Sequence, residues 1–397
     1  MTDLPLTGYR VLELAHLVAG PVCGMCLADM GADVIKVESP DGGDALRQTY
    51  RAPEGRDSPA FLVLNRNKRS LVLDLARPEG REAFRRLAAV ADVVIEAYRG
   101  GVAERLGIDS ASFSTINPRL IYCSLSAFGP EGPWRNKPGV DMLIQAMSGL
   151  MAITGEAGGG PVLIGAPLVD TIGGLLASQA ILTALLHREK TGEGQRVDVS
   201  LLEGALLAQA ARLPIFWASG EDPGRHGSAH AHLAPFQAFQ ARDGWIYVAV
   251  WVDRMWKPFC HVMGLDDLAA DHRLLTRDSR REHRRELVAR LEPLFRARTV
   301  AEWMVSLEAA DVLCAPINTY ADLDADPQIR ALGAFQQQEH PRAGRVRTLG
   351  TPARFEKTPG TLRLPAPALG EHSDEVLREA GLDRTQIDRL RQGNVIR

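Results

Sequence analysis

Residues 11–38 read VLELAHLVAGPVCGMCLADMGADVIKVE, and this stretch decides the fold. Its first four residues predict a short buried strand, and residues 34–37 predict a second strand of the same kind. Between them we expect a helix that begins near Ala19-Gly20-Pro21 and ends before Gly31. A strand, a helix and a second strand in this order form a parallel unit, because parallel neighbours need a crossover connection.

The same alternation continues through the first 200 residues. Pro78 lies where a helix would begin, a position at which its missing N–H costs nothing. Alternating strands and helices imply a mostly parallel sheet with helices on both faces. Further strands are predicted at residues 71–75, 93–95, 120–124 and 195–200, and further helices at residues 142–151, 171–189 and 201–217.

The chain has 397 residues, more than a single hydrophobic core usually serves, so two domains are expected. The sequence pattern changes at a loop that begins at Ser219-Gly220. We predict a small domain at residues 225–320, inserted between residues 1–224 and 321–397 of a larger domain. The small domain should hold a strand at 245–250 and helices near 254–263, 280–297 and 300–309, and two helices near 373–380 and 384–392 should end the chain.

Composition excludes several classes of protein. A net charge of −3 argues against a broad nucleic-acid surface. The first residues show no basic segment followed by an apolar stretch and a cleavage site, so no signal peptide is expected. The longest apolar segment, residues 175–186, is judged too short and too polar to cross a membrane. Five Cys make no disulfide framework, which fits a cytoplasmic protein.

Two short motifs near the N-terminus do not predict a redox enzyme. Cys23 and Cys26 have the spacing of a redox pair, but both fall within an apolar helix, where Cys is readily buried. Ala19-Gly20-Pro21 occupies the turn that carries the glycine fingerprint in dinucleotide-binding folds. It has only one glycine of that fingerprint, so a nicotinamide or flavin enzyme is not expected. The helix N-terminus there still suits a phosphate group.

Three imidazoles, those of His226, His230 and His232, stand in a loop rich in Gly and Ala. A zinc site would need carboxylate or Cys ligands at tight spacing, which are absent. A solvated or substrate-covering loop is the favoured interpretation, and no metal site is predicted.

Asp170 precedes the long apolar helix predicted at residues 171–189. An Asp in this place is normally an N-cap. The positive end of the helix should keep its carboxylate ionised, and Gly173 and Gly174 should leave room for a bulky reacting group. The sequence therefore permits Asp170 to be a nucleophile without demanding it.

Five segments together resemble the CaiB/BaiF family of CoA-transferases (class III, formyl-CoA transferase-like). They are residues 11–38, 65–75 (NRNKRSLVLDL), 92–107 (DVVIEAYRGGVAERLG), 117–129 (NPRLIYCSLSAFG) and 185–201 (LLHREKTGEGQRVDVSL). The likeness continues through Ala234-Pro235-Phe236, Asp243-Gly244-Trp245 and Gly370-Glu371-His372, and so covers nearly the whole chain in order.

The resemblance implies a Rossmann-like large domain, a smaller α+β domain and a homodimer of interlocked subunits. It places the family's nucleophile on Asp170. It also implies that coenzyme A, bound as acyl-CoA substrate and not as a resident cofactor, contacts one set of positions. These are Leu17, Val18, Ser39, Leu73, Asp74, Ala97, Tyr98, Arg99, Arg105 and Lys137. Of these, Arg99, Arg105 and Lys137 would hold phosphates.

Two departures from the family pattern carry information. Many relatives have Arg where this chain has Ser39, which puts one phosphate contact in doubt. In the G-x-D motif the middle residue is Val140, whereas the racemases of the family carry there the His that they use as a base. Val140 cannot transfer a proton, which favours a transferase. An α-methylacyl-CoA racemase or isomerase, and a non-catalytic acyl-CoA-binding protein, remain the alternatives.

The function implied is transfer of CoA from an acyl-CoA donor to a small carboxylic acid, of the dicarboxylic or hydroxy type. Asp170 would pass through a mixed anhydride and an aspartyl-CoA thioester, because a free carboxylate attacks a thioester poorly. Backbone N–H groups of the loop at 224–232 are expected to stabilise the oxyanion intermediates. Acyl-CoA, the acid and a second copy of the chain are the expected partners, without nucleic acid or membrane.

Overall fold

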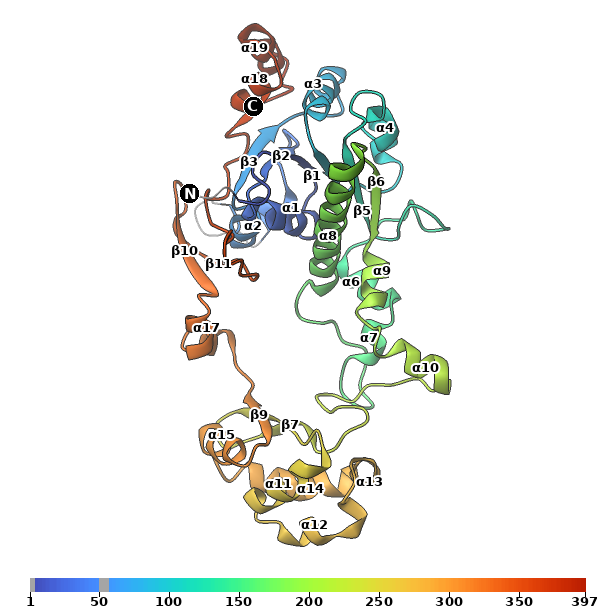
Figure 1. Ribbon diagram of the computed structural model, residues 1–397, viewed down its shortest axis with the longest axis vertical. Helices are drawn as coiled ribbons and strands as arrows, with labels where there is room; N and C mark the ends of the chain where they lie inside the picture. Colours follow the sequence, from blue (N-terminus) through green and yellow to red (C-terminus); the bar gives the residue numbers. More distant parts are fainter. Residues whose placement is uncertain (1–3, 50–56) are drawn as a thin grey trace. The chain divides into compact units, whose positions relative to one another are not determined.

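The computed structural model describes residues 4–49 and 57–397, so residues 1–3, part of the segment judged for a signal peptide, lie outside it. The described chain falls into two compact units (Figure 1). Unit 1 comprises the residues up to Leu150, Ile164–Ala211 and Gln328–Arg397, and unit 2 comprises Met151–Leu163 and Arg212–Pro327. These boundaries differ from the predicted 225–320, because residues 151–163, 212–224 and 321–327 also group with unit 2.

A six-stranded parallel sheet forms the centre of unit 1, in the order β3-β2-β1-β4-β5-β6. Leu12 of β1 pairs with Ile35 of β2 on one side and with Val94 of β4 on the other. The chain runs outward from β1 to β3 and then returns to β4, so the strand order reverses between β1 and β4. The strands are β1 (Arg10–Leu14), β2 (Asp33–Glu38), β3 (Lys68–Val72), β4 (Val93–Glu96), β5 (Ile121–Ser126) and β6 (Arg196–Ser200).

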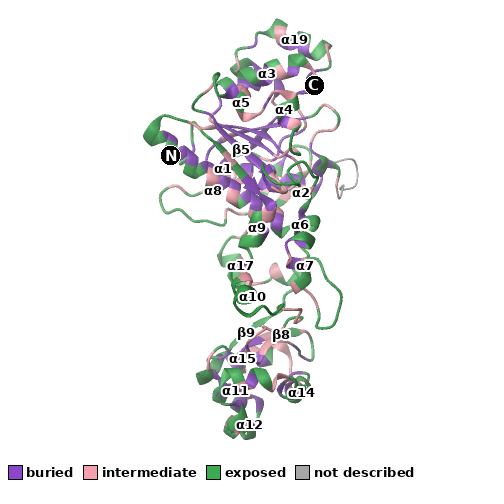
Figure 2. Cartoon of the chain, turned by 90° about the vertical axis from the view of Figure 1, so that its right-hand side faces the viewer, coloured by how far each residue is buried: buried purple, intermediate pink, exposed green. Residues whose placement is uncertain are grey.

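Both faces of this sheet are covered, because its strands are apolar on both sides (Figure 2). Val11 and Val34 belong to a core with α1 (Ala19–Asp29) and α8 (Leu168–Thr191). Their neighbours Leu12 and Ile35 belong to a second core with α3 (Pro78–Ala89), α5 (Ser110–Phe113), α18 (Ser373–Glu379) and α19 (Arg384–Gln392). The predicted Rossmann-like arrangement is thereby confirmed.

Two predicted helices are each divided in two, and a local feature explains each break. Gly149, at φ 91°, separates α6 (Asp141–Met147) from α7 (Leu150–Ile153). Pro214 lies in the first turn of α10 (Leu213–Ser219), where a helix starts but cannot continue from α9 (Leu201–Leu207). By contrast α8, at Leu168–Thr191, extends beyond the predicted residues 171–189 at both ends.

The remaining elements of unit 1 are short. An antiparallel hairpin of β10 (Phe335–His340) and β11 (Gly344–Leu349) was not predicted. The others are η1 (Ala45–Gln48), α2 (Pro59–Leu64), α4 (Val102–Leu106) and α17 (Pro327–Ala331), the last of which begins at the final residue of unit 2.

Unit 2 combines a three-stranded antiparallel sheet with helices, as predicted for an α+β domain. Its sheet has the order β7-β8-β9, with β7 (Phe236–Gln240), β8 (Trp245–Ala249) and β9 (Leu313–Pro316). Phe239 stacks on Phe295 at 4.3 Å between ring centroids, in a core that includes Trp256 and Trp303. The helices are η2 (Asp253–Met255), α11 (Trp256–Met263), α12 (Asp266–Ala270), η3 (His272–Leu274), α13 (Arg277–Glu282), α14 (Arg284–Phe295), α15 (Val300–Ala309) and α16 (Tyr320–Leu323).

Helix α8 corrects one expectation. Its 24 residues are long and apolar enough, by length and composition, to cross a membrane, whereas its apolar core was judged too short and too polar. Core helices of soluble proteins pass the same test. The buried residues of α8, among them Val169, Ala177 and Ile181, share a core with α1 and the sheet. Length and hydropathy alone therefore assign no membrane role to it.

Candidate active site

Asp170 lies within the first turn of α8, not ahead of it. The N-cap residue is Pro167, whose own side chain forms no capping hydrogen bond. Asp170 is therefore not the N-cap that the sequence suggested. Its carboxylate still lies at the positive end of a long helix dipole.

The two glycines that follow Asp170 serve packing. A Cβ atom on Gly174 would lie 2.5 Å from the Ala19 carbonyl oxygen, and one on Gly173 would lie 2.3 Å from Leu201 Cδ2. Glycine at position 174 is thus required for α8 to approach the backbone of α1, and the space beside Gly173 is filled by the end of the Leu201 side chain. This corrects the expectation that both glycines leave space for a reacting group.

The surroundings of Asp170 disfavour the ionised form of its carboxyl group. Its side chain is half-buried, and Asp141 Oδ2 accepts a hydrogen bond from its backbone N–H at 3.0 Å. Burial and, secondly, the Asp141 carboxylate raise the pKa of Asp170 to about 6. Within residues 4–49 and 57–397, no group donates a hydrogen bond to the Asp170 carboxylate. It remains mostly ionised at neutral pH, but less strongly than the helix terminus alone would make it.

Asp141 is itself held in place. It is buried at the start of α6, and Gln145 Nε2 donates to its Oδ1 at 2.6 Å. Gln145 Oε1 in turn accepts from the N–H of Ile164 at 3.0 Å. The G-x-D motif pointed to Asp141, but the sequence did not reveal its contact with Asp170, which is 29 residues away.

The turn after β1 and the end of β4 both lie close to the N-terminal part of α8. A Cβ atom on Gly20 would lie 2.1 Å from Ala15 Cβ and 3.9 Å from Ala97 Cβ. Ala19, its neighbour, is the residue that Gly174 of α8 approaches. Leu17, Val18 and Ala97 are therefore brought close to the N-terminus of α8, at the carboxyl edge of the sheet.

The predicted phosphate-binding cations have exposed side chains. Arg99 Nε donates to the Asn136 carbonyl oxygen, which brings it beside Lys137. The Lys137 ammonium lies 5.0 Å from the centroid of the Trp134 ring, and Arg105 lies on α4. In the described part of the chain, no carboxylate forms an ion pair with any of these three. All three remain available to an anionic ligand.

Four other predicted contact residues are hydrogen-bonded within the chain or packed against its core. The Leu73 side chain is only 2% exposed, and its N–H donates to the Glu38 carbonyl oxygen at 2.9 Å. Asp74 Oδ1 accepts from the N–H of Ala76, and Ser39 Oγ accepts from the N–H of Asp41. Tyr98 is half-buried against the core, and burial raises the pKa of its hydroxyl to about 12. No contact joins these residues to Asp170, so their roles stay predictions.

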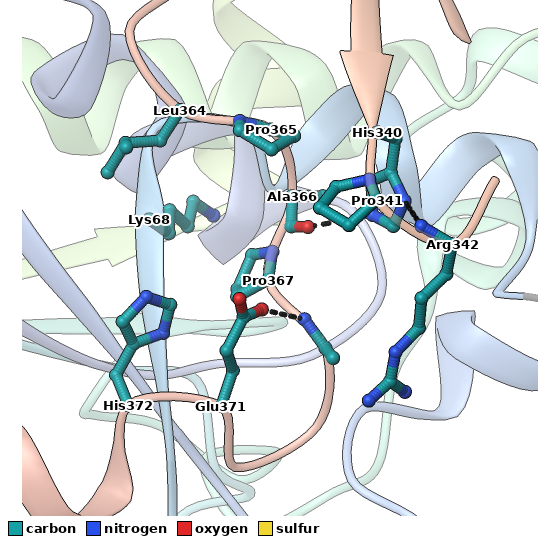
Figure 3. Close-up of a pocket in the computed structure, with 11 residues that line it drawn as sticks. Lys68, His340, Pro341, Arg342, Leu364, Pro365, Ala366, Pro367, Glu371 and His372 are labelled. Atoms are coloured by element: carbon teal, nitrogen blue, oxygen red, sulfur yellow. Dashed lines mark hydrogen bonds between the residues drawn. The ribbon is translucent and has the colours of Figure 1, made fainter. Parts of the chain in front are cut away.

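Unit 1 also has a hollow away from Asp170. A cavity of about 180 Å³ opens beside the edge strand β3 (Figure 3). Lys68, His340, Arg342, Glu371 and His372 are among its lining residues, and none of them is a predicted site residue. The His340 ring is occupied, because its Nε2 meets the Ala366 carbonyl oxygen at 2.9 Å. This cavity does not belong to the candidate site.

The Cys pair and the His loop, for which no redox or metal role was predicted, have the following settings. Cys23 is fully buried, and burial raises the pKa of its thiol. His230 stacks on Phe236 at 4.9 Å, and its Nδ1 accepts from the N–H of His232. Over the described ranges, no group of three His, Cys, Asp or Glu is placed to hold a metal. The loop at 224–232 belongs to unit 2, and its role toward oxyanions stays a prediction.

The fold and site together define a Rossmann-like α/β protein with a half-buried carboxylate at the start of α8 and exposed cations in the same unit. The sequence model of CoA-transferase family III matches residues 6–373. The chain belongs to this family, the CaiB/BaiF family of the sequence analysis. It is accordingly an acyl-CoA:carboxylate CoA-transferase.

Similar proteins align with this chain over almost their whole length. The succinate–glutarate CoA-transferase of Agrobacterium fabrum is 37% identical, over 96% of this chain and 98% of its own. The succinyl-CoA:mesaconate CoA-transferase of Haloarcula hispanica is 36% identical, over 95% and 96%. The crystal structure of a CaiB/BaiF family protein from Brucella suis is 39% identical, with a TM-score of 0.87 over 96% of this chain and 100% of that one.

Proposed function

We propose that this protein transfers CoA from an acyl-CoA, of which succinyl-CoA is the first to test, to a small dicarboxylic acid, with Asp170 as the nucleophile. The observation that carries the proposal is the carboxylate of Asp170, half-buried, raised in pKa and free of hydrogen-bond donors among the described residues. A carboxylate that is poorly solvated and poorly hydrogen-bonded is a stronger nucleophile than one in water. The proteins from Agrobacterium and Haloarcula, named for glutarate and mesaconate, support dicarboxylic acids as acceptors.

The reaction divides into four balanced steps. An Asp170 oxygen attacks the donor thioester carbon, so a C–O bond forms, the C–S bond breaks, and a mixed anhydride and CoA thiolate result. The thiolate then attacks Asp170 Cγ, which forms an aspartyl-CoA thioester and releases the donor acid. The acceptor carboxylate attacks the same carbon, which forms a C–O bond, breaks the C–S bond, regenerates an anhydride and releases the thiolate again. Finally the thiolate attacks the acceptor's acyl carbon, which restores the Asp170 carboxylate without net proton transfer.

Unpaired cations near the site suit the CoA phosphates. Arg99, Arg105 and Lys137 are exposed and pair with no carboxylate of residues 4–49 and 57–397, so binding a phosphate would break no ion pair among these residues. Guanidinium groups bind phosphate oxygens in pairs, and the Lys137 ammonium adds a point charge.

Transfer assays on a panel of acids test the reaction. Succinyl-CoA would be incubated with glutarate, mesaconate, malate and matched monocarboxylic acids, and the new CoA esters would be separated by chromatography. We expect the dicarboxylic acids to be converted much faster. Deuterium exchange at the α-carbon of a 2-methylacyl-CoA without transfer would indicate the racemase alternative. CoA binding without either reaction would indicate a non-catalytic binding protein.

Replacing the nucleophile tests the mechanism. Asp170→Asn should lower kcat by about 10⁴-fold or more, because the amide cannot form the anhydride. Hydroxylamine added during turnover should convert Asp170 to a hydroxamate, visible by mass spectrometry of its peptide. Asp267→Asn, an exposed surface change in unit 2, is the matched control. Full activity in Asp170→Asn with no adduct on the wild-type peptide would exclude this mechanism.

We also propose that the active protein is an interlocked homodimer in the cytoplasm. The support for a second copy is the apolar surface that α8 and its neighbours expose. Leu175 and Leu186 of α8 are 49% and 59% exposed, and a groove of about 580 Å³ runs between α8, β6 and α9. Surfaces of this kind on soluble proteins usually meet a partner.

A further inference from the structure

Leu17 has an unusual backbone conformation in the turn that follows β1. Its φ angle is 64°, in the left-handed region that leucine rarely adopts. The side chain is 40% exposed, so packing of the leucine itself does not impose this angle. A residue in such a conformation persists only where its surroundings fix it, and such residues gather at functional sites.

The fixing contacts are made to the two peptide groups that flank His16. On one side, Lys36 Nζ donates to the Ala15 carbonyl oxygen at 2.8 Å. On the other side, the N–H of Leu17 donates to Asp44 Oδ1 at 3.0 Å. Lys36 Nζ and Asp44 Oδ2 are themselves paired at 2.8 Å, so the two side chains that bind the backbone of the turn form one ion pair.

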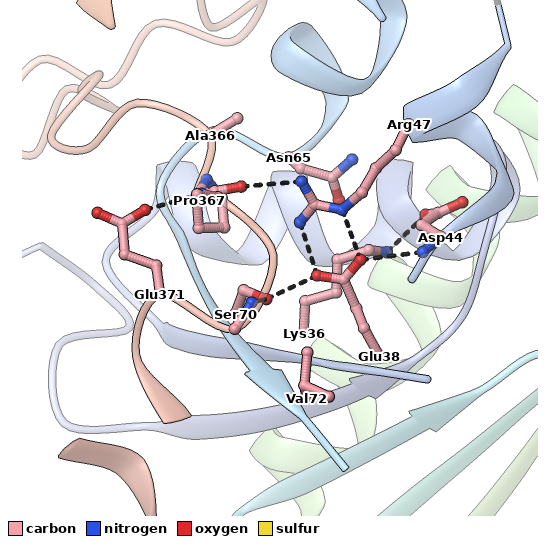
Figure 4. Close-up of polar contacts among 12 residues, drawn as sticks. Lys36, Glu38, Asp44, Arg47, Asn65, Ser70, Val72, Ala366, Pro367 and Glu371 are labelled. Carbon is pink, nitrogen blue, oxygen red and sulfur yellow. Dashed lines mark hydrogen bonds and ion pairs between the residues drawn. The ribbon is translucent and has the colours of Figure 1, made fainter. Parts of the chain in front are cut away.

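This ion pair belongs to a larger buried network (Figure 4). Lys36 Nζ also meets Glu13 Oε1 at 2.9 Å, and Glu13 Oε2 meets Lys68 Nζ at 2.7 Å. Lys68 Nζ donates to the carbonyl oxygen of Pro21, in the first turn of α1. Asp44 is held in turn, since its N–H donates to Glu38 Oε2 at 3.0 Å. The side chains of Glu13, Lys36, Asp44 and Lys68 are all fully buried.

Such a network is weak evidence for stability, because burying four charges costs much of what their attraction returns. Its contacts reach the backbone on both sides of the turn and the start of α1. The turn lies at the carboxyl end of β1, next to β4, where the strand order reverses and ligands of such sheets bind. The placement points to a role in shaping that edge.

We infer that Lys36 and Asp44 are positioning residues, which hold Leu17 in its left-handed conformation so that the turn can receive acyl-CoA. Neither side chain is exposed, so both act through the backbone of the turn and not by touching the substrate. The inference rests on the proposed function, which assigns acyl-CoA to this edge of the sheet. It adds two buried residues to the positions that the resemblance assigns to CoA.

The test is a rescue experiment with binding of free CoA as its readout, measured by calorimetry on the resting protein. Asp44→Asn keeps the size of the side chain but weakens its contacts with Lys36 and with the Leu17 N–H. It should lower CoA affinity at least tenfold. Glycine adopts positive φ without strain. Leu17→Gly added to Asp44→Asn should therefore recover most of the lost affinity. In turnover, Asp44→Asn should raise KM for acyl-CoA far more than it lowers kcat.

Asp29→Asn is the matched control for burial. Asp29 is buried in the same unit and pairs with Arg66 at 2.6 Å, and none of its contacts reaches the turn. It should lower the unfolding temperature without changing CoA affinity. If both variants weaken CoA binding alike, the effect is general destabilisation and the inference fails. It also fails if Asp44→Asn binds CoA like the wild type, or if Leu17→Gly does not restore binding.

A second pair of variants leaves the side chains of the network unchanged, in case Asp44→Asn does not fold. Leu17→Pro forces a negative φ and removes the N–H that Asp44 accepts, so it should bind CoA at least tenfold more weakly than Leu17→Gly. Equal affinity of the two would overturn the inference. CoA binding needs no turnover, so the outcomes separate. If the variants change CoA affinity as expected but the wild type transfers no CoA, the proposed function fails and the positioning role stands. If the wild type transfers CoA and Asp44→Asn binds CoA with unchanged affinity, the positioning role fails and the proposed function stands.

Discussion

The carboxylate of Asp170 is surrounded by features that make it basic. Burial and Asp141 raise its pKa to about 6, so a fall in pH through 6 converts the nucleophile to the acid. We expect the transfer rate to fall toward tenfold per pH unit below about 6, because only the anion reacts. A pH–rate profile between pH 4.5 and 8 measures this directly.

A variant of Asp141 tests whether Asp170 is the group that causes the acidic limb of this profile. Asp141→Asn removes a negative charge near Asp170, so the acidic limb should move to lower pH, toward the ordinary value of a carboxyl group. Asp198→Asn, which removes an acid that pairs with Arg196, is the control and should leave the limb in place. A limb that does not move in Asp141→Asn would mean that the group titrating near pH 6 is not Asp170.

The same shift predicts that Asp170 lowers stability. A carboxyl group whose pKa is higher in the folded than in the unfolded protein costs free energy once the pH exceeds its unfolded value, near 3.8. The cost grows between pH 4 and 6 and is complete above 6. Asp170→Asn should therefore raise the free energy of unfolding by about 1–2 kcal/mol at pH 7.5, allowing for partial exposure, and by almost nothing at pH 4. Denaturant unfolding at both pH values measures it, and a loss of stability at pH 7.5 would refute it.

At the scale of elements, the crossing of α1 and α8 positions the nucleophile. Gly174→Ala would place a methyl group 2.5 Å from the Ala19 carbonyl oxygen and 2.8 Å from Val22 Cβ, so one helix must move. We expect a loss of about 2 kcal/mol or more in unfolding free energy and a fall in activity, because Asp170 lies one turn away. Chemical denaturation and the transfer assay provide both measurements.

Gly204→Ala is the matched control, since it is also a glycine inside a helix of unit 1. Its methyl group would meet Ile172 and Leu176 at 3.4 Å, which is tight but without backbone in the way. Alanine favours the helix by up to about 1 kcal/mol over glycine, so this variant should be neutral or slightly stabilised. Equal losses in the two variants would show that the close approach of α8 to α1 is not the cause.

The sequence predicted most elements of the sheet because its strands are short apolar runs between clear helix signals. It failed where local signals were weak. The strand at 335–340 reads FQQQEH, with almost no apolar alternation, and so the β10–β11 hairpin was not foreseen. The break at Gly149 was missed because an isolated glycine is tolerated within a helix pattern, and its positive φ is set by the tertiary structure.

At the scale of the whole molecule, the candidate site illustrates what the sequence can and cannot reveal. Asp170 and the segments around Leu17, Ala97 and Lys137 were identified through the resemblance. Their meeting at one edge depends on contacts such as Asp141 with Asp170, which no periodicity encodes. The buried pairs of Lys36 and Lys68 with acids also escaped notice, because Lys in a strand is ordinarily read as exposed.

The exposed apolar surface of unit 1 leads to the last prediction. Leu182 and Leu186 of α8 are 44% and 59% exposed, beside the groove that is lined by β6, an edge strand with unpaired backbone groups. If a second copy covers this surface, the protein should sediment at twice its 43.2 kDa at every concentration tested. Interlocked subunits cannot part on dilution without opening, so nanomolar samples should show no monomer over hours.

Two charged substitutions separate the explanations for this surface. Leu182→Glu with Leu186→Glu should weaken assembly, because the carboxylates would be buried in the interface, and activity should fall with it. Val305→Glu, at an exposed apolar position of unit 2, is the control and should remain dimeric. A wild-type chain that sediments at 43.2 kDa would refute the dimer. If that monomer also bound lipid vesicles through α8, with binding lost in the double variant, a membrane and not a second copy would cover the helix.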